Sequence, residues 1–533
     1  MRAGRRQRLE WRLVAELLHE VVAEAAAGDP ARAAVVASDG TATFVELDRM
    51  VTALASWVAE RTAPGDRVAV VADNSLAYVA CYHAIPRAGR VVTLVNQRLS
   101  AGDQRVQLDL AEPSLVVGDA AFLDALVADG LDLPTAAFGS PDWVTATTAD
   151  PDPDLAVALP PPAPDDPAWL LFTSGSTGAP KGVVHTHRSL LAAARGTVEG
   201  RSVRGGGVYL LPFPMCHVAG YNVLVQHLVG STVVLTAHFR ADEFVSLVEA
   251  HGVASCSLAP TMLHALVAHL DEGSGAGAGP GGPRPMPTLR NIAYGAAAMS
   301  PDLLRRAAER LDVGFDQGYG MTEAGGNVTF LGPEEHRRGL TTEPALLATA
   351  GRPHSGIEVA IADDDGALLP AGTTGEIVLR GDPVTPGYWR DEAATAASRT
   401  PDGWFRTGDI GRFDADGRLS VVDRKKDVII TGGENVSSRE VEDVLSTHPA
   451  VDQVAVVGVP DDYWGEAICA VVVPAAGATP TPGELADHVR AHSSPLKRPR
   501  HVVFVDALPT TTNGKVAKDA VRRLARHHLD ALP

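Results

Sequence analysis

The sequence predicts an α/β protein with a large N-terminal domain and a small C-terminal domain. Three observations carry this prediction: strand-like and helical patterns alternate up to about residue 330, strand-rich sequence fills about 350–422, and a compact strand–helix pattern follows. Such alternation is typical of parallel sheets, and 533 residues exceed one ordinary domain. We therefore expect parallel-sheet α/β subdomains and a small β-rich subdomain in 1–422, a boundary at 423–426 and an α+β domain in 427–533.

The elements of the N-terminal part follow from the spacing of apolar residues. Short apolar runs indicate buried strands, and apolar residues three or four apart indicate helices. The expected strands are Arg67–Ala72, Ser114–Gly118, Ala168–Thr173, Val208–Leu211, Thr232–Thr236 and Ser255–Ala259. The expected helices are Leu9–Ala27, Phe44–Arg61, Ser189–Val198, Ala241–His251, Pro260–Asp271 and Pro301–Leu311.

The β-rich part and the C-terminal part show shorter elements separated by Gly and Asp turns. In the β-rich part, we expect strands at Gly375–Arg380 and Arg418–Val422. In the C-terminal part, the expected order is helix Ser438–Ser446, strands Val451–Val459 and Glu466–Val473, helix Thr481–His492 and strand His501–Val505. About 110 residues are enough for a small α+β domain.

The charge and cysteine content exclude several classes of protein. The chain carries 46 Lys and Arg against 65 Asp and Glu, so its formal net charge of −19 disfavours nucleic-acid binding. No apolar run approaches the ~20 residues that span a bilayer. The four cysteines, Cys81, Cys216, Cys256 and Cys469, are too far apart for a CxxC pair and form no disulfide framework by spacing. We expect a soluble, cytoplasmic protein with no membrane span.

The segment LLFTSGSTGAPKG, Leu170 to Gly182, carries the strongest local signal. An apolar strand runs into a loop of Thr, Ser and Gly, whose small side chains let main-chain N–H groups approach an anion closely. Lys181 adds positive charge. The spacing is not that of a Walker A loop, because Gly182 follows the lysine directly. The alternative interpretation is an ordinary Gly/Ser turn.

The run TSGSTGAPKG resembles the phosphate loop of the adenylate-forming superfamily, which includes acyl-CoA synthetases, firefly-luciferase-like enzymes and peptide-synthetase adenylation domains. Further motifs follow in the order typical of that superfamily, and the similarity covers roughly residues 35–520. The resemblance implies an N-terminal AMP-binding domain and a mobile C-terminal domain. It places ATP against Thr173, Ser174, Gly175, Ser176, Thr177, Gly178 and Lys181.

The motif QGYGMTE, Gln317 to Glu323, puts a carboxylate after a Gly-flanked aromatic residue at the end of a strand. By resemblance, Tyr319 and Gly320 lie against adenine, Thr322 contacts phosphate and Glu323 helps to hold Mg²⁺. A single carboxylate suits Mg²⁺, which takes its other ligands from phosphate and water. The alternatives are a core aromatic residue for Tyr319 and an acid at a helix N-terminus for Glu323.

Two more motifs resemble parts of the nucleotide site. In YGAAAMS, residues 294–300, Gly295, Ala296 and Ala297 correspond to a segment that lines the adenine site and the acyl pocket. Ala296 stands where the family usually has glycine, so its methyl group could narrow the acyl entrance. In WFRTGDI, residues 404–410, Asp409 corresponds to the aspartate that accepts the ribose hydroxyls, and a turn aspartate is the alternative.

The C-terminal motifs imply a hinge and a second half of the site. In DRKKDVIITGGEN, residues 423–435, Arg424 matches a ribose and phosphate arginine and Lys426 the hinge position. Gly432 and Gly433 resemble the glycines beside the pantetheine tunnel. In TTTNGKVAK, residues 510–518, the resemblance gives Lys515 the role of the catalytic lysine, whereas we expect Lys518 to be a surface residue.

The segment PFPMCHVAG, Pro212 to Gly220, resembles the one whose histidine lies beside the acyl phosphate. His217 is therefore a candidate catalytic residue, with a purely structural histidine as the alternative. Tyr221 and Asn222 are candidate acyl-pocket residues. No charged residue in 215–222 or 293–300 points to a charged acid, which favours an apolar one.

Together these motifs predict an ATP-dependent, AMP-forming ligase that activates a fatty or other apolar acid and passes the acyl group to coenzyme A. The expected cofactors are ATP, Mg²⁺ and coenzyme A as co-substrate. The alternative is a stand-alone ligase of a secondary-metabolite pathway that loads a carrier protein or another acceptor. A homodimer stays open. A nucleotide-binding protein without catalysis is disfavoured, because Lys515, Glu323, Asp409 and Arg424 occur together.

Overall fold

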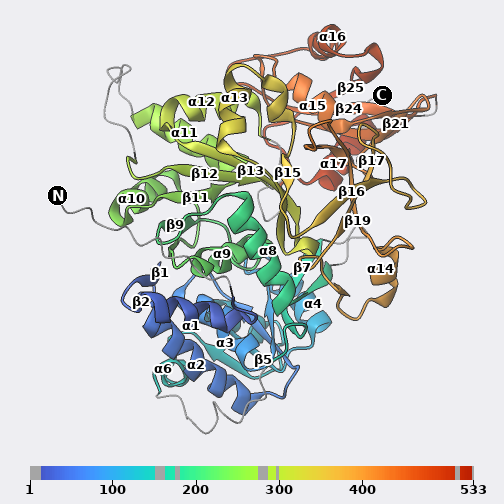
Figure 1. The fold of residues 1–533 in the computed structure, drawn as a ribbon. Helices are drawn as coiled ribbons and strands as arrows, with labels where there is room; N and C mark the ends of the chain where they lie inside the picture. The colour runs from blue at the N-terminus through green and yellow to red at the C-terminus, as the bar shows by residue number, and fades with distance from the viewer. Residues whose placement is uncertain are drawn as a thin grey trace, which may run out of the picture.

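The structure is a computed structural model that describes residues 14–149, 162–174, 180–273, 286–295, 299–461, 463–510 and 516–530. In these ranges the strands form four sheets, two large and two small. Figure 1 shows the N-terminal segments at the bottom of the view, the β-rich segment at the right and the C-terminal domain at the top. The expected α/β fold class is confirmed.

A seven-stranded sheet takes up the first part of the chain, in the order β18-β8-β7-β4-β3-β5-β6. Its five strands from β7 to β6 are parallel, as the alternating pattern predicted, and β8 and β18 add antiparallel strands at one edge. The bounds are β3 Arg67–Val71, β4 Val91–Leu94, β5 Leu115–Gly118, β6 Thr135–Ala137, β7 Pro167–Ser174, β8 Pro180–Thr186 and β18 Gly387–Tyr388.

A nine-stranded sheet has the order β15-β14-β13-β12-β11-β9-β10-β1-β2. It is parallel from β13 to β1 and antiparallel at both ends. The bounds are β1 Ala33–Ala37, β2 Gly40–Thr43, β9 Val208–Leu211, β10 Thr232–Leu235, β11 Ser255–Leu258, β12 Asn291–Gly295, β13 Gly314–Met321, β14 Gly326–Leu331 and β15 Arg352–Pro353.

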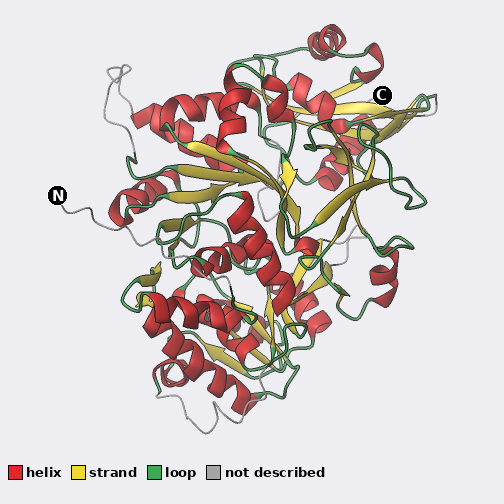
Figure 2. Ribbon diagram, in the orientation of Figure 1, coloured by secondary structure: helices red, strands yellow, loops and turns green. Residues whose placement is uncertain are grey.

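Helices separate and cover the two large sheets, with α8 running through the middle of the molecule (Figures 1 and 2). One continuous apolar core joins α1, α2, α3, α8 and α9 to the seven-stranded sheet. The bounds are α1 Leu18–Gly28, α2 Phe44–Arg61, α3 Leu76–Arg87, α4 Ala101–Ala111, α5 Ala120–Ala128, α6 Pro141–Thr148, α8 His187–Gly200, η1 Val218–Tyr221, α9 Asn222–Leu228, α10 Ala241–His251, α11 Pro260–Gly273, α12 Pro301–Leu311, η2 Thr322–Ala324, α13 Pro333–Thr341 and η3 Pro344–Ala348.

The β-rich subdomain is a four-stranded antiparallel sheet in the order β16-β17-β19-β20. Its strands match the expected strand-rich stretch of about 350–422. The bounds are β16 Glu358–Ala362, β17 Gly375–Arg380, β19 Phe405–Phe413 and β20 Leu419–Arg424, with α14 Glu392–Ala397 beside them.

The C-terminal domain is a β-sheet with an apolar core on each face, because alternate residues of a strand point to opposite faces. Val456 and Ile468 face α15 and α16, whereas Val457 and Cys469 belong to the core that includes α17. The bounds are β21 Ile429–Thr431, β22 Glu434–Val436, α15 Ser438–Leu445, β23 Val451–Asp461, β24 Gly465–Pro474, α16 Pro482–His492, η4 Pro495–Lys497, β25 His501–Phe504 and α17 Lys518–Asp530.

The first helix differs from the expected Leu9–Ala27, because α1 begins only at Leu18. Its first turn is held by the side chain of Glu20, which accepts hydrogen bonds from the main-chain N–H groups of Glu16 and Leu17. This cap ends the extended segment before it. Among the helices of the described residues, none is both long and apolar enough to cross a membrane.

Buried histidines hold α1 against the core. The N–H group of Leu18 donates to Nδ1 of His187, so that ring is neutral, and the carbonyl oxygen of Leu18 bonds to Nδ1 of His83. His83 stacks on His227 with ring centroids 5.8 Å apart. Burial lowers the pKa of His83 and His187 to about 4 and that of His227 to about 3.

These histidines predict acid sensitivity. Below about pH 6.5 the unfolded chain binds protons that the folded chain does not take up until about pH 4, so the free energy of unfolding should fall over this window. Each such histidine contributes a slope of about 1.4 kcal/mol per pH unit. Urea unfolding at pH 8, 6.5, 5.5 and 4.5 measures the slope.

The control is a pair of single variants. We expect His227→Gln to flatten the pH dependence and His251→Gln, on the exposed face of α10, to leave it unchanged. Equal slopes in both variants would contradict the assignment.

Candidate active site

The carboxylate of Asp409 joins the nine-stranded sheet to the β-rich sheet. Tyr319 Oη, on β13, donates to Asp409 Oδ2 at 2.7 Å, and Arg424 Nε lies 3.4 Å from Asp409 Oδ1. Arg424 is the register partner of Asp409 on the neighbouring strand β20. Asp409 is only 6% exposed, and its main-chain N–H donates to Thr407 Oγ1 at 3.0 Å. The expected adenine and ribose residues therefore meet at the buried carboxylate of Asp409, whereas the side chain of Arg424 is 60% exposed.

Glycine is required in the strand that carries Tyr319. A Cβ atom on Gly320 would lie 2.0 Å from the carbonyl oxygen of Gly326, on the neighbouring strand β14. Only glycine allows this approach of two backbones. The motif QGYGMTE thus owes its glycine at this position to sheet packing as well as to any contact with a nucleotide.

Glu323 lies in the short turn η2 that follows β13, beside residues of the seven-stranded sheet. Its Oε1 atom accepts a hydrogen bond from Tyr388 Oη at 3.1 Å, and its carbonyl oxygen accepts from the N–H of Thr385 at 2.7 Å. The ammonium group of Lys181 lies 5.0 Å from the centre of the Tyr388 ring. Burial raises the pKa of Glu323, and the charge of Arg424 partly opposes this. Tyr388 thus links the carboxylate to the lysine.

Thr322 is held by a buried histidine of β8. His185 Nε2 hydrogen-bonds to the carbonyl oxygen of Thr322 at 2.7 Å, and its Nδ1 to Ser189 Oγ at 3.0 Å. Burial lowers the pKa of His185 to about 4, so the ring is neutral near pH 7. A neutral imidazole with both nitrogens bonded is a support that fixes the turn carrying Thr322 and Glu323.

The predicted phosphate loop is described only at its two ends. Thr173 on β7 pairs in register with Lys181 on β8, and the backbone of Ser174 pairs with Pro180, so the two strands lead into and out of the loop as expected. Several predicted site residues lie outside the described residues, namely Gly175, Ser176, Thr177, Gly178, Ala296, Ala297 and Lys515. Gly295, the last residue of β12, pairs with Gly318.

The segment that carries His217 is pinned from the other large sheet. Asn74, 3% exposed, donates to the carbonyl oxygen of Phe213 and accepts from the N–H of Met215, each at 2.8 Å. His217 follows at the start of η1 and is half-buried. Its expected role beside the acyl group stays a prediction.

Tyr221 and Asn222 are buried between α8, α9 and the nine-stranded sheet. Tyr221 Oη bonds to Thr197 Oγ1 at 3.0 Å. Asn222 accepts from Arg201 Nη1 at 3.3 Å and donates to the carbonyl oxygen of Ala219. They follow the segment of His217 in the chain, and their expected role in an acyl pocket stays a prediction.

The boundary at 423–426 contains one buried anchor and one exposed ion pair. Asp423 Oδ2 accepts from the N–H of Ser438 at 2.6 Å and from the hydroxyls of Ser437 and Ser438. Lys426 Nζ lies 3.4 Å from a carboxylate oxygen of Asp519, and both side chains are about half exposed. The buried anchor ties the start of α15 to the end of β20, while the exposed pair is worth little.

The two glycines predicted beside a thiol tunnel have backbones that favour glycine. Gly432 has φ +62° and Gly433 φ +83°. A Cβ atom on Gly432 would lie 2.8 Å from the ring of Trp464, whose carbonyl oxygen also accepts from the N–H of Gly432. A larger side chain at Gly432 therefore strains the backbone and displaces Trp464.

Lys518 is not the free surface residue that we expected. Its ammonium group donates to Ser438 Oγ, Glu442 Oε1 and the carbonyl oxygen of Val456 at 2.6–2.8 Å. Three partners inside the domain fix the start of α17, three residues after Lys515. Its sequence neighbours alone did not signal these contacts, because all three partners lie 62–80 residues away.

The chemistry of Glu323 fits a magnesium ion brought by a nucleotide. Its Oε1 atom is bonded to Tyr388, whereas no hydrogen bond within the described residues uses Oε2. The described residues hold no cluster of three or more His, Cys, Asp or Glu that could bind a metal by themselves. One carboxylate oxygen with phosphate and water ligands is the arrangement that Mg²⁺ prefers.

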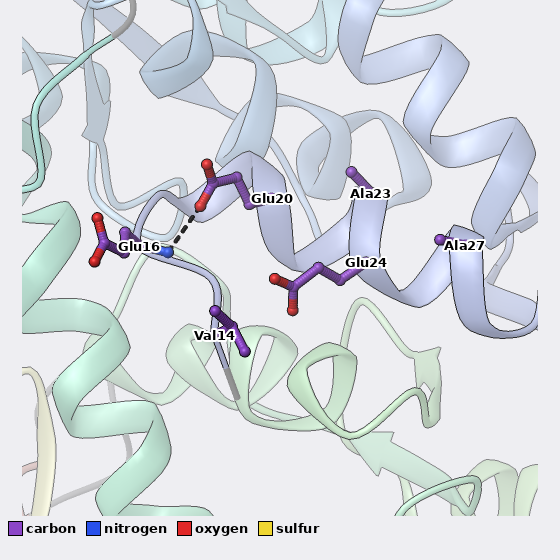
Figure 3. Close-up of a pocket in the computed structure, with 6 residues that line it drawn as sticks. All are labelled: Val14, Glu16, Glu20, Ala23, Glu24 and Ala27. Carbon is purple, nitrogen blue, oxygen red and sulfur yellow. Dashed lines mark hydrogen bonds between the residues drawn. The ribbon is translucent and has the colours of Figure 1, made fainter. Parts of the chain in front are cut away.

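A surface hollow on α1 has no part in this site. Three of its lining residues are the carboxylates Glu16, Glu20 and Glu24, which would repel a nucleotide (Figure 3). Helix α1, which carries most of the lining residues, lies in the lower half of the view in Figure 1, away from β13 and β19.

Sequence reasoning missed three residues of the candidate site, Tyr388, His185 and Asn74, and also the anchoring contacts of Asp423, which it had placed in the boundary. Tyr388 had a signal, since it follows a glycine and precedes a tryptophan. The others act through partners distant in sequence: His185 through Thr322, Asn74 through Phe213 and Met215, and Asp423 through Ser438. Only the tertiary fold brings these partners together.

Comparisons with known proteins agree with the geometry. The family model described as AMP-binding enzyme matches residues 22–389, and that of the AMP-binding enzyme C-terminal domain matches residues 440–515. A feruloyl-CoA synthase of Amycolatopsis sp is 37% identical over 500 residues, which are 92% of this chain and 96% of that relative. The fatty acid–acyl-carrier-protein ligase ScoC of Streptomyces coeruleorubidus is 33% identical over 512 residues, 93% of each chain.

Among solved structures, the amide bond synthetase McbA from Marinactinospora thermotolerans superposes with a TM-score of 0.84 at 32% identity. The match covers 95% of this chain and 99% of that one. The resemblance in sequence and fold thus extends over nearly the whole chain.

The buried anchor of the boundary generates a prediction. Asp423→Asn exchanges a charged acceptor for a neutral one while keeping its shape, so the C-terminal domain should lose about 2–4 kcal/mol of stability. Limited proteolysis and thermal unfolding measure this loss. Asp452→Asn, on the exposed surface of the same domain, is the control. Identical proteolysis of both variants would show that the anchor contributes nothing.

Proposed function

We propose a function from one premise: this chain belongs to the family of AMP-binding enzymes. As such it is an acid–thiol ligase that uses ATP to activate a carboxylic acid as an acyl adenylate and releases AMP when the acyl group passes to coenzyme A. The observation that carries the proposal is the meeting of Tyr319 and Arg424 at the buried carboxylate of Asp409. The charges of Asp409 and Arg424 both act on the pKa of the nearby Glu323.

In the first step, a carboxylate oxygen of the acid attacks the α-phosphorus of ATP. A new O–P bond forms, the bond between the α-phosphorus and its bridging oxygen breaks, and pyrophosphate leaves. The obstacle is charge, because an anion approaches a polyanion. Arg424 on β20 and Lys181 on β8 supply positive charge that lowers this repulsion. We assign the same role to Lys515.

Other residues of this chain hold the nucleotide in place. Asp409 accepts a hydrogen bond from Tyr319 through Oδ2, and its carboxylate would also accept hydrogen bonds from the ribose hydroxyls. The ring of Tyr319 would provide an apolar face for adenine. Mg²⁺ bound at Glu323 would neutralise phosphate charge. His185 is neutral and fixes the turn that carries Thr322, which would contact a phosphate group. The histidine therefore supports this contact without adding a charge of its own.

In the second step, a thiol sulfur attacks the acyl carbon, a C–S bond forms, and the C–O bond to AMP breaks. The two steps need different surroundings at one acyl carbon. We propose that the C-terminal domain rotates about Lys426 and exchanges Lys515 for the glycines 432–433. The exposed, weak pairing of Lys426 with Asp519 supports this, because it can break at little cost.

The choice of acceptor distinguishes the proposal from its alternative. Among the relatives, one is named for coenzyme A and another for an acyl-carrier protein, and a similar structure is named as an amide bond synthetase. Coenzyme A is the acceptor that we propose for this chain, and a carrier protein or an amine is the second candidate. An acid with a large apolar part is part of the same proposal.

Pyrophosphate release tests the function directly. We expect release with ATP, Mg²⁺ and a panel of carboxylic acids, a strong increase on addition of coenzyme A, and an acyl-CoA product detected by mass spectrometry. If coenzyme A does not change pyrophosphate release but a carrier protein or an amine increases it, the acceptor is that carrier protein or amine and not coenzyme A. No release from any acid would contradict the proposal.

Half-reactions separate the two poses of the C-terminal domain. Lys515→Ala should lower adenylate formation about 100-fold or more, because a charge that stabilises the transition state is lost, yet leave thioester formation from supplied acyl adenylate intact. Gly432→Ala should do the reverse, because its Cβ meets Trp464.

Matched controls make the result specific. Lys425→Ala removes a lysine that pairs with Asp364 and Glu376 outside the site, and Gly477→Ala strains a glycine of φ +76° with no neighbour within 4 Å. Loss of both half-reactions in Lys515→Ala would contradict the division of roles.

A further inference from the structure

A buried polar cluster lies beside Asn222, a residue of the proposed acyl site. Arg201, which follows α8, donates through Nη1 to Asn222 Oδ1 at 3.3 Å and to Ser257 Oγ at 3.5 Å. Tyr209 on β9 donates to the same serine at 2.7 Å. Residues of α9, β9 and β11 and the residue that follows α8 thus form one hydrogen-bonded cluster.

The carboxylate of Asp316 adds a negative charge to this cluster. It is 2% exposed and stands on β13, three residues before Tyr319. Its Oδ2 atom accepts from Asn291 Nδ2 at 2.7 Å, whereas its Oδ1 atom is buried with no hydrogen-bond partner among the described residues. A buried acceptor without a partner costs free energy, so its presence calls for an explanation.

Arg201 does not satisfy this acceptor. Its charge acts on Asp316 and partly opposes the effect of burial, which raises the pKa of Asp316 to about 6. Yet these two described residues form no ion pair within 4.0 Å, and Arg201 Nε is also buried without a hydrogen-bond partner. A donor and an acceptor of opposite charge therefore face the same region without meeting.

The cluster is continuous with the proposed acyl site. Asn222, the partner of Arg201, begins α9 directly after Tyr221, and Asp316 precedes Gly318, which pairs with Gly295. Asp316 thus lies on β13, the strand that carries Tyr319, and Asn222 begins α9, which follows the segment of His217.

We propose that Arg201 and Asp316 select an acid that carries a hydroxyl group at its far end. A hydroxyl group both accepts and donates one hydrogen bond, so it can accept from Arg201 and donate to Asp316 Oδ1. A second carboxylate would meet the charge of Asp316, and a methyl end would leave both groups unpaired. The inference rests on the proposed function and refines the expectation of a purely apolar acid.

Matched pairs of acids test the inference. The pairs are 3-phenylpropanoate with 3-(4-hydroxyphenyl)propanoate and octanoate with 8-hydroxyoctanoate, and kcat/KM comes from pyrophosphate release. In at least one pair we expect the hydroxy acid to be preferred about 10-fold or more, as for a hydrogen bond to a charged group. Preference for the parent acid in both pairs would overturn the inference.

Variants separate recognition from structural support. Arg201→Met and Asp316→Asn should each bring the ratio of kcat/KM for the hydroxy acid to that for its parent acid close to one. The control Arg204→Met, at an exposed arginine three residues later, should leave this ratio unchanged. If both site variants lower kcat/KM for parent and hydroxy acid by the same factor, the cluster only supports the fold and the inference is overturned. Arg201→Met decides the matter if Asp316→Asn does not fold.

The melting temperature in the presence of each acid measures binding without catalysis, so it tests the inference independently of the proposed function. A larger rise with the hydroxy acid, lost in Arg201→Met, supports the inference even if no acid gives pyrophosphate. Equal rises with both acids of each pair overturn it, whatever the catalytic result.

Discussion

A buried carboxylate must find partners, and at Asp409 this requirement joins the nine-stranded sheet to the β-rich sheet. One oxygen is bonded to Tyr319 of the nine-stranded sheet and the other faces Arg424, the last residue of the β-rich sheet. An ionised group in this setting is tolerated only with such partners. Because Glu323 follows Tyr319 by four residues and Lys426 follows Arg424 by two, the turn of Glu323 and the start of the C-terminal domain take their positions from the same point.

The boundary between the domains combines strong and weak contacts. Asp423 is buried and accepts three hydrogen bonds from Ser437 and Ser438, whereas Lys426 and Asp519 meet in solvent. Solvent-exposed pairs contribute little to stability, and buried charged groups that lose a partner cost much more. The buried contacts hold the start of α15 to β20, and the exposed pair can break at little cost, as the proposed rotation of the C-terminal domain requires.

The proposed choice of acid depends on residues outside the nucleotide motifs. Arg201 follows α8, Ser257 lies on β11 and Asp316 on β13, and none belongs to the motifs that suggested an AMP-forming ligase. Their shared property, polar groups buried beside Asn222, exists only after α8, α9 and the nine-stranded sheet have packed. Substrate choice in such a site depends on a few hydrogen bonds and small changes of volume.

Local pattern was enough for the fold class and the order of the elements, whereas the roles of the residues in the nucleotide motifs stay predictions. Helix Phe44–Arg61 and strand Gly375–Arg380 were predicted to the residue, because their apolar spacing and end signals act within a few positions. The start of α1 was not, since Glu20 caps the helix inside the apolar pattern. Tertiary structure alone decided the partners of Asp409, the role of Lys518 and the cluster around Arg201. Their contacts join residues far apart in the chain, and burial gives those contacts their strength.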